Sequence, residues 1–123
     1  MKQIYFLIFI LIIMICNCQT NNNPPNTPSV PIGDSFGIVG ALYNFTSQVS
    51  DMDNDRVAIR FAWGDGDTTS WGFHGASDSA MTKGHTWTDA GFYYIKTQAR
   101  DEHDEISGWS SGHQIMISNI KTN

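Results

Sequence analysis

From Ala41 onward, apolar residues alternate with polar ones, and clusters of turn-forming residues interrupt the pattern about every ten residues. A period of two places successive side chains on opposite faces of a β-strand, whereas a helix would need a period of about 3.6. Short strands separated by regular turns are typical of a β-sandwich or a barrel. The folded part is therefore predicted to be all-β, and no segment of it requires a helix.

Two stretches carry the clearest alternation. The first strand is expected to direct four side chains to one face, namely Tyr43, Phe45, Ser47 and Val49. The central core strand is expected at 57–63, with four large side chains on one face, namely Val57, Ile59, Phe61 and Trp63. Further strands are predicted at 92–100, with Tyr93, Ile95, Thr97 and Ala99 on one face, and at 114–120, which supplies Ile115 and Ile117 to the sheet. Weaker strands are predicted near 28–40 and 77–87. About seven strands is the number of an immunoglobulin-like β-sandwich.

The first eighteen residues have the layout of an export signal. Lys2 supplies a positive charge, and Ile4 to Ile15 form an uncharged apolar run. As a helix, these residues would reach about 18 Å, which is short of the roughly 30 Å thickness of a bilayer core. Cleavage or lipid attachment is therefore expected rather than a lasting transmembrane helix.

Both cysteines of the chain, Cys16 and Cys18, stand at the end of this apolar run, so a disulfide within the downstream domain is excluded. The segment resembles a bacterial lipoprotein signal, in which the cysteine that closes the run is acylated and becomes the mature N-terminus. Cys18 follows the small Asn17 and is expected to carry the lipid in preference to Cys16, which follows the bulky Ile15. The protein would then be lipid-anchored in the cell envelope; the alternative is simple secretion after cleavage.

Residues 19–31 (QTNNNPPNTPSVP) have no apolar periodicity and are dominated by Asn, Pro and Thr. Such a composition does not bury enough apolar surface to fold. The segment is predicted to be a disordered tether between the signal at 1–18 and a domain at 32–120.

The chain contains a series of short motifs, which are, in order, an acidic turn at 51–55 (DMDND), a Trp-Gly-Asp-Gly turn at 63–66, GHTW at 84–87, AGFYY at 90–94, ARD at 99–101 and GWS at 108–110. This series resembles the microbial repeats of the PKD (polycystic kidney disease) domain family. The order and spacing of these motifs cover about Ser29 to Ser118. Asn54 replaces the usual Gly of the acidic turn, and Asn tolerates a left-handed backbone. The resemblance implies a non-catalytic immunoglobulin-like sandwich used for binding or adhesion.

The acidic turn is a candidate calcium site. Asp51, Asp53 and Asp55 stand at alternate positions, and closely spaced carboxylates suit a hard, oxygen-seeking cation. The pattern lacks the Gly and Glu of an EF-hand, so further ligands would have to come from elsewhere, with Asp101 or Asp104 as candidates. Some PKD domains bind calcium near this turn. The alternative is that the Asp and Asn side chains cap a tight turn.

The loop after the core strand is a candidate ligand-binding loop. Trp71 and Phe73 would offer flat aromatic surface for stacking on a sugar or on a partner protein. The alternative is that Trp71 folds back over the edge of the sheet. Trp63 and Trp87 are expected in the core.

Composition narrows the classes of function. The chain has only 7 Lys and Arg residues against 12 Asp and Glu, so nucleic acid is not expected as a partner. The sequence contains no G-x-S-x-G nucleophile motif, and its four histidines lack zinc-site spacing. We therefore expect that the protein is not an enzyme. It is expected to be a surface-anchored module that binds a polysaccharide or a cell-surface protein. The alternative is a structural spacer, or a truncated copy of a larger cell-surface protein.

Overall fold

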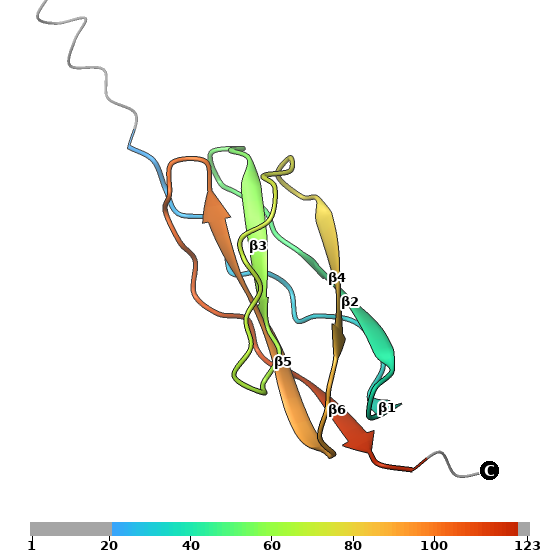
Figure 1. Cartoon of the computed structure of the whole chain (residues 1–123). Helices are drawn as coiled ribbons and strands as arrows, with labels where there is room; N and C mark the ends of the chain where they lie inside the picture. Colours follow the sequence, from blue (N-terminus) through green and yellow to red (C-terminus); the bar gives the residue numbers. More distant parts are fainter. Residues whose placement is uncertain (1–20, 121–123) are drawn as a thin grey trace, which may run out of the picture.

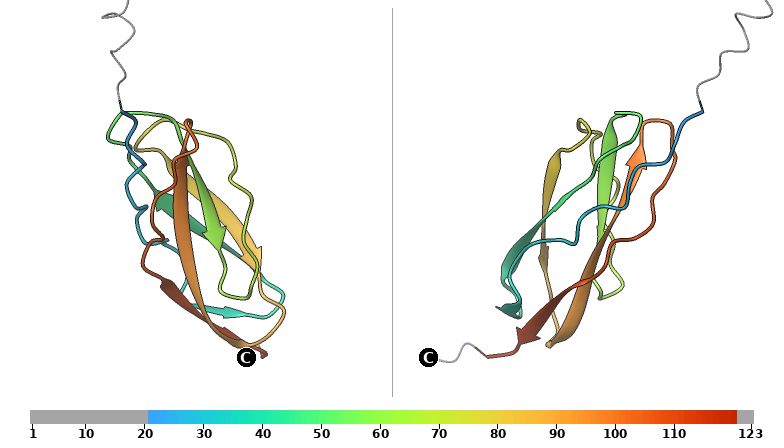
Figure 2. Two further views of the ribbon diagram at one scale, coloured as in Figure 1. Left: turned by 90° about the vertical axis from the view of Figure 1, so that its left-hand side faces the viewer. Right: turned by 180° about the vertical axis from the view of Figure 1, so that it is seen from behind.

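The computed structural model describes residues 21–120 (Figure 1). The segments with alternating apolar and polar residues form six strands in this part of the chain. The strands are β1 (Phe36–Ile38), β2 (Leu42–Gln48), β3 (Val57–Ala62), β4 (Ala80–Thr86), β5 (Gly91–Asp101) and β6 (His113–Ser118). One sheet has the order β1-β6-β5-β3, and the other consists of β2 and β4. The sheets lie face to face as a β-sandwich (Figure 2), which confirms the predicted fold class.

The core lies between the two sheets and is filled by the residues that the alternation predicted. Phe45 of β2 and Phe61 of β3 are fully buried, as are Ile95 of β5 and Ile115 of β6. Burial of each such side chain contributes roughly 1.5 to 3 kcal/mol to the stability of the fold.

Aromatic rings join the two sheets at the centre of this core. Trp87 is fully buried and packs edge-on against both Phe45 and Trp63, at centroid distances of 6.1 Å. Its indole Nε1 donates a hydrogen bond of 3.3 Å to the carbonyl oxygen of Trp63. Burial of Trp63 and Trp87 agrees with the sequence-based expectation.

The expected disordered tether at 19–31 is wrong for residues 21–31, which lie along the sandwich. The N–H groups of Asn26, Ser29 and Ile32 donate hydrogen bonds to carbonyl oxygens of the β2 region, at distances between 2.8 and 3.0 Å. Three prolines at the same spacing are buried, namely Pro25, Pro28 and Pro31. A repeat of three residues is that of a polyproline II helix, so the edge of β2 is covered by an extended, proline-rich segment.

These prolines also explain why a strand predicted near 28–40 is reduced to β1 and a single bridge between Ile32 and Thr46. Proline has no N–H group, so this segment cannot form a continuous ladder with β2. The described residues form six strands, where about seven were expected.

The segments that position the candidate site lie at one end of the sandwich. The described part of the chain begins at this end and finishes at the opposite end, beyond β6 (Figure 1). Among residues 21–120, no helix is long and apolar enough to cross a membrane.

Candidate functional site

Two turns of the same construction lie at the end of the sandwich where the described chain begins. In the turn before β3, Asp51 Oδ1 accepts hydrogen bonds from the N–H groups of Asp53 at 2.8 Å and Asp55 at 3.3 Å. In the turn after β5, Asp101 Oδ1 accepts bonds from the N–H groups of His103 and Glu105, both at 2.9 Å. Side-chain caps of this kind explain why Asp begins each turn.

Each turn also contains a non-glycine residue with a left-handed backbone. Asn54 has a φ of 58° and Asp104 has a φ of 68°. Asn and Asp tolerate this conformation better than other residues with a side chain do. Asn54 therefore has a backbone conformation that glycine adopts most readily.

Sheet register brings the two turns together. β3 and β5 are antiparallel, and Val57 pairs with Asp101, so the turn before β3 and the turn after β5 lie side by side. The N-terminal segment connects them: Asn22 Nδ2 donates to Asp101 Oδ2 at 2.7 Å, and the N–H of Asn23 donates to Asp53 Oδ2 at 2.6 Å. We call this group of residues, 21–23, 51–55 and 101–105, the acidic pole.

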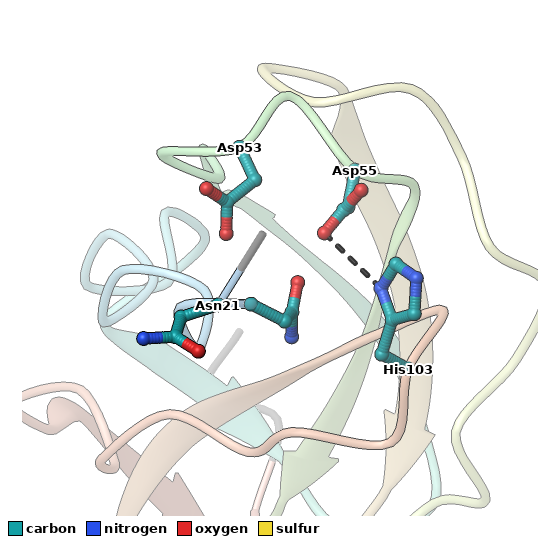
Figure 3. A pocket seen from close by; sticks show the side chains of 5 residues that line it. Asn21, Asp53, Asp55 and His103 are labelled. Carbon is teal, nitrogen blue, oxygen red and sulfur yellow. Dashed lines mark ion pairs between the residues drawn. The ribbon is translucent and has the colours of Figure 1, made fainter. Parts of the chain in front are cut away.

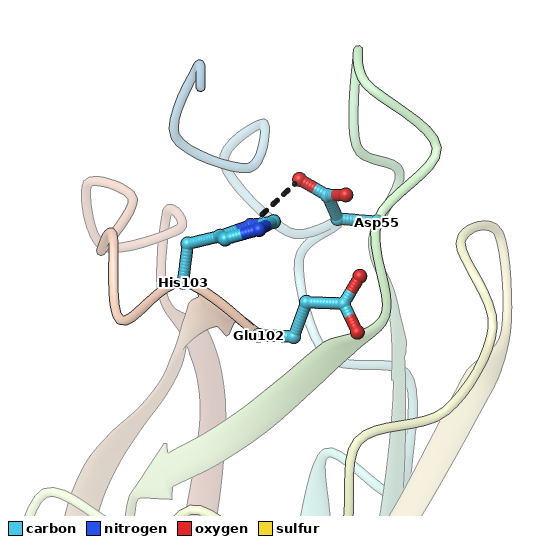
Figure 4. Close-up of side chains that lie close together, drawn as sticks. All are labelled: Asp55, Glu102 and His103. Carbon is cyan, nitrogen blue, oxygen red and sulfur yellow. Dashed lines mark ion pairs between the residues drawn. The ribbon is translucent and has the colours of Figure 1, made fainter. Parts of the chain in front are cut away.

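An open pocket of about 360 Å³ lies in the acidic pole (Figure 3). Its lining residues come from all three segments and are Asn21, Asn22, Asp53, Asp55 and His103. His103 Nδ1 lies 3.2 Å from Asp55 Oδ2, and Figure 4 shows the side chain of Glu102 next to this pair. The lining therefore combines carboxylates, carboxamides and one imidazole.

Two groups of side chains in the acidic pole have the spacing of metal ligands. One group is Asp51, Asp53 and Asp55, the other is Asp55, Glu102 and His103, and in each group the candidate ligand atoms lie within 4.8 Å of one another. Asp51 is only 7 % exposed, and its second oxygen, Oδ2, has no hydrogen-bond partner among residues 21–120. A buried carboxylate oxygen without a partner is costly, and a cation would satisfy it.

Electrostatics in the acidic pole oppose the ionised form of Asp55. Burial raises the pKa of Asp55 above the ordinary value of an aspartate, and the neighbouring His103 partly offsets this effect. The negative charges of Asp51, Glu102 and Asp53 raise the pKa further. A site that concentrates negative charge in this way attracts cations.

A second candidate site lies on the outer face of β3 and β5. Two extended segments flank these strands: Thr69 N–H donates to the carbonyl oxygen of Phe61 in β3, and Ser110 N–H donates to that of Thr97 in β5. The first segment carries Trp71 and the second carries Trp109. The two indoles therefore approach the same strands from opposite edges.

Arginines fix these indoles above the sheet. The guanidinium of Arg60 lies 4.4 Å from the centroid of Trp71 and 5.1 Å from that of Trp109. Arg100 lies 5.0 Å from the centroid of Trp71. Cation–π contacts of this length contribute about 0.5 to 2 kcal/mol each. We call Arg60, Trp71, Arg100 and Trp109 the Trp–Arg face.

The fold and the motif order agree with a comparison to solved structures. A PKD domain of an M14-like peptidase from a Thermoplasmatales archaeon superposes with a TM-score of 0.74 and 30 % sequence identity, and the match covers 80 % of this chain and 100 % of that domain. This chain belongs to the PKD domain family. No family model matches the sequence, and a search of the curated proteins gave no match.

More distant structures share the fold of this PKD domain. Two structures of a CARDB domain from Pyrococcus furiosus superpose with TM-scores of 0.52 and 0.51, each at 14 % identity. They cover 82 % and 79 % of this chain, and the match covers 100 % and 97 % of theirs. One of them was solved in complex with di-metal ions. PKD domains are a non-catalytic domain type, although the archaeal one belongs to a peptidase.

The Gly-Asp-Gly turn of the PKD pattern is built into the scaffold. Asp65 Oδ1 accepts a hydrogen bond from the N–H of Asp67, and Asp65 Oδ2 lies 2.7 Å from His85 Nε2. The imidazole of His85 in turn stacks on the buried Trp63, at a centroid distance of 4.7 Å. Asp65 and His85 therefore join the turn to the core.

The structure places the predicted site residues in two separate groups. Asp51, Asp53 and Asp55 lie together in the acidic pole, and Asp51 also caps its turn, so it fits both interpretations of the sequence. Trp71 folds over the sheet beside Arg60, whereas Phe73 in the same loop is 97 % exposed.

Several residues of the acidic pole do not follow from the sequence. The sequence suggests Asp101 or Asp104 as further metal ligands, but the second candidate metal group contains their neighbours Glu102 and His103. Asn21 and Asn22 fall in the segment that the sequence predicts to be a tether. The repeated Asp at the start of 51–55 and 101–105 is the sequence signal that could have paired the two turns.

The predicted lipid attachment site falls outside the described residues. Both Cys18 and Cys16 precede residue 21, so acylation and signal cleavage stay predictions.

Proposed function

We propose that this PKD protein is a non-catalytic, surface-anchored module that binds a carbohydrate or a protein partner through its Trp–Arg face. The supporting observation is that two indoles are held at the surface rather than in the core. Trp109 is 40 % exposed, and Trp71 is only partly buried. Large rigid rings lose little conformational entropy on binding, so exposed aromatics of this kind favour recognition.

Attachment to the cell surface is part of the proposal. Acylation of Cys18 would hold the protein in the cell envelope, with Cys16 as the less favoured site and free secretion as the alternative. Because the N-terminal segment joins the sandwich at the acidic pole, an N-terminal lipid would direct this pole towards the membrane. The rest of the sandwich would extend away from it.

The acidic pole is proposed to bind calcium. Asp51, Asp53 and Asp55 supply carboxylate oxygens, and the unpartnered Oδ2 atom of Asp51 is the observation that supports a cation there. A cation bound between the turns and the N-terminal segment would stiffen this end of the domain.

Binding through the Trp–Arg face can be tested with a panel of surfaces. Residues 19–123 would be incubated with insoluble cellulose, chitin and peptidoglycan, and with immobilised gelatin as a protein surface, and the bound fraction measured. We expect binding to at least one surface. The double variant Trp71→Ala, Trp109→Ala should lose it, whereas Phe36→Ala, which truncates an exposed ring on β1, should not. Equal binding by all three proteins would contradict the proposal.

Calcium binding can be tested by thermal unfolding of the same chain in calcium and in a chelator. A ligand that binds only the folded state raises the midpoint of unfolding. We expect this rise to be lost in Asp53→Asn and kept in Asp104→Asn, because Asp104 belongs to neither metal-binding group. If the midpoint of unfolding rises with zinc but not with calcium, and His103→Ala loses this rise, the metal ligands would instead be Asp55, Glu102 and His103.

A structural spacer is the second candidate function. It is favoured because the described part of the chain enters the sandwich at one end and leaves it at the other, as a spacer requires (Figure 1). Absence of binding to every surface in the panel, with an intact fold, would support this function.

A further inference from the structure

We propose that the partner of the Trp–Arg face is an acidic polysaccharide, whose carboxylates bind Arg100 while its sugar rings lie against the indoles. This inference rests on the proposed binding function and specifies its ligand. It follows from the separation of charge over the molecule, from the different roles of the two arginines, and from the exposure of the rings.

Positive charge is gathered on this face although the chain is acidic. Register places Arg60 on β3, and Lys96 and Arg100 on β5, on the side of the sheet away from the core. The acidic residue within these two strands is Asp101, which is fully buried on the other side. Many of the carboxylates are in the turns at 51–55 and 101–105 instead. A negatively charged ligand would thus meet three cations along the strands.

The two arginines have different roles. Arg60 donates from Nε at 3.0 Å and from Nη2 at 2.6 Å to Oε1 of Gln98, so its guanidinium is held within the protein. The guanidinium of Arg60 also lies over the rings of Trp71 and Trp109, so Arg60 is a positioning residue for the indoles.

Arg100 is the arginine that can receive a ligand. Its side chain is 29 % exposed, and its ion pair with Asp104 Oδ1 is long, at 3.7 Å. Asp104 is 82 % exposed, so water competes for it and the pair is weak. Arg100 Nε itself is buried, without a hydrogen-bond partner among residues 21–120, so a ligand carboxylate that replaces Asp104 would bind the solvent-accessible part of the guanidinium.

Uronic acids match this combination of groups. Each sugar presents a flat set of C–H groups, which suits an indole, together with a carboxylate, which suits a guanidinium. An acidic peptide would satisfy the charge but would present no flat ring to Trp71 and Trp109. The observations therefore favour a polysaccharide over a peptide.

The test compares two polymers with the same backbone. Affinity of residues 19–123 would be measured by calorimetry for polygalacturonate and for its fully methyl-esterified form, which lacks the charge. We expect binding to polygalacturonate and much weaker binding to the ester. Arg100→Gln should weaken binding about tenfold or more, as loss of a charged hydrogen bond does. Lys121→Gln removes one positive charge from a residue that is not part of the Trp–Arg face and should leave binding unchanged.

Other results would overturn the inference in distinguishable ways. Equal affinity for the ester would show that carboxylates are not recognised, while the proposed carbohydrate binding would stand. Equal losses in Arg100→Gln and Lys121→Gln would show attraction by net charge alone. Binding to polyglutamate but to neither polysaccharide would identify an acidic peptide as the partner. Binding to none of these polymers, nor to the surfaces of the earlier panel, would overturn both proposals.

Discussion

At the scale of single residues, Asp65 shows how one carboxylate joins a turn to the core. Partial burial by itself would raise the pKa of Asp65, but hydrogen bonds from His85 and from the N–H of Asp67 outweigh it and lower the pKa below 3.8. A lowered pKa in the folded state stabilises the fold at pH values above the ordinary aspartate pKa. That stability is lost as the pH falls through the pKa of the folded state.

Asp65→Asn should therefore destabilise the protein by about 1 kcal/mol near neutral pH, because it loses the charge that faces His85. The difference between wild type and variant should shrink as the solution is acidified to about pH 2. Chemical denaturation at several pH values measures both free energies of unfolding. A difference that stays constant across this range would contradict the role given to the charge.

Two phenylalanines provide a matched test of the core. Phe61 is fully buried and stacks on Trp63 at 5.3 Å, so Phe61→Ala should lower the free energy of unfolding by about 3 to 5 kcal/mol. Phe73 is exposed, and Phe73→Ala should change it by less than about 0.5 kcal/mol. Denaturant titration of both variants checks the prediction, which fails if the two losses are similar.

At the scale of elements, the Gly-Asp-Gly turn is constrained by the strand beneath it. A Cβ atom on Gly64 would lie 2.8 Å from Tyr94 N and 2.9 Å from Tyr94 O, and the φ of Gly64 is +82°. Gly66 has a similar φ, of +92°, but open space around it. Gly64→Ala should therefore cost clearly more stability than Gly66→Ala, which should lose about 1 to 2 kcal/mol to backbone strain alone. Thermal unfolding of the pair measures the difference, and equal losses would show that the contact with β5 can relax.

The N-terminal segment is a second element whose role can be measured. A chain that begins at Pro28 lacks the hydrogen bonds from Asn22, Asn23 and Asn26, as well as the buried Pro25. It should be less stable than residues 19–123 by about 1 to 3 kcal/mol. If both chains unfold at the same denaturant concentration, the segment is a tether after all.

At the scale of the whole molecule, both sheets share one core. Phe45 and Trp87 link β2 and the end of β4 to Trp63 at the end of β3, so neither sheet has a core of its own. A domain of this kind should unfold in one cooperative transition. We expect tryptophan fluorescence and far-ultraviolet circular dichroism to give the same midpoint, and two separate midpoints would show that the β2–β4 sheet opens independently.

How far the sequence predicts this molecule depends on the range of the interaction. The faces of β2, β3, β5 and β6 followed from alternation, because that pattern depends only on neighbouring residues. The PKD family followed from the order of short motifs. The path of residues 21–31 did not follow, because a composition without apolar periodicity gave no sign that prolines at every third position would pack along β2.

The sequence by itself determined which segments from Ala41 onward are strands, which side chains of the long strands face the core, and where Asp residues stand in turns. Only the tertiary structure decided which of these turns meet. The pairing of Val57 with Asp101 brings residues some 45 positions apart into one acidic pole, and it also places Arg100 beside Trp71. Such contacts depend on the pairing and register of distant strands, which no local pattern specifies.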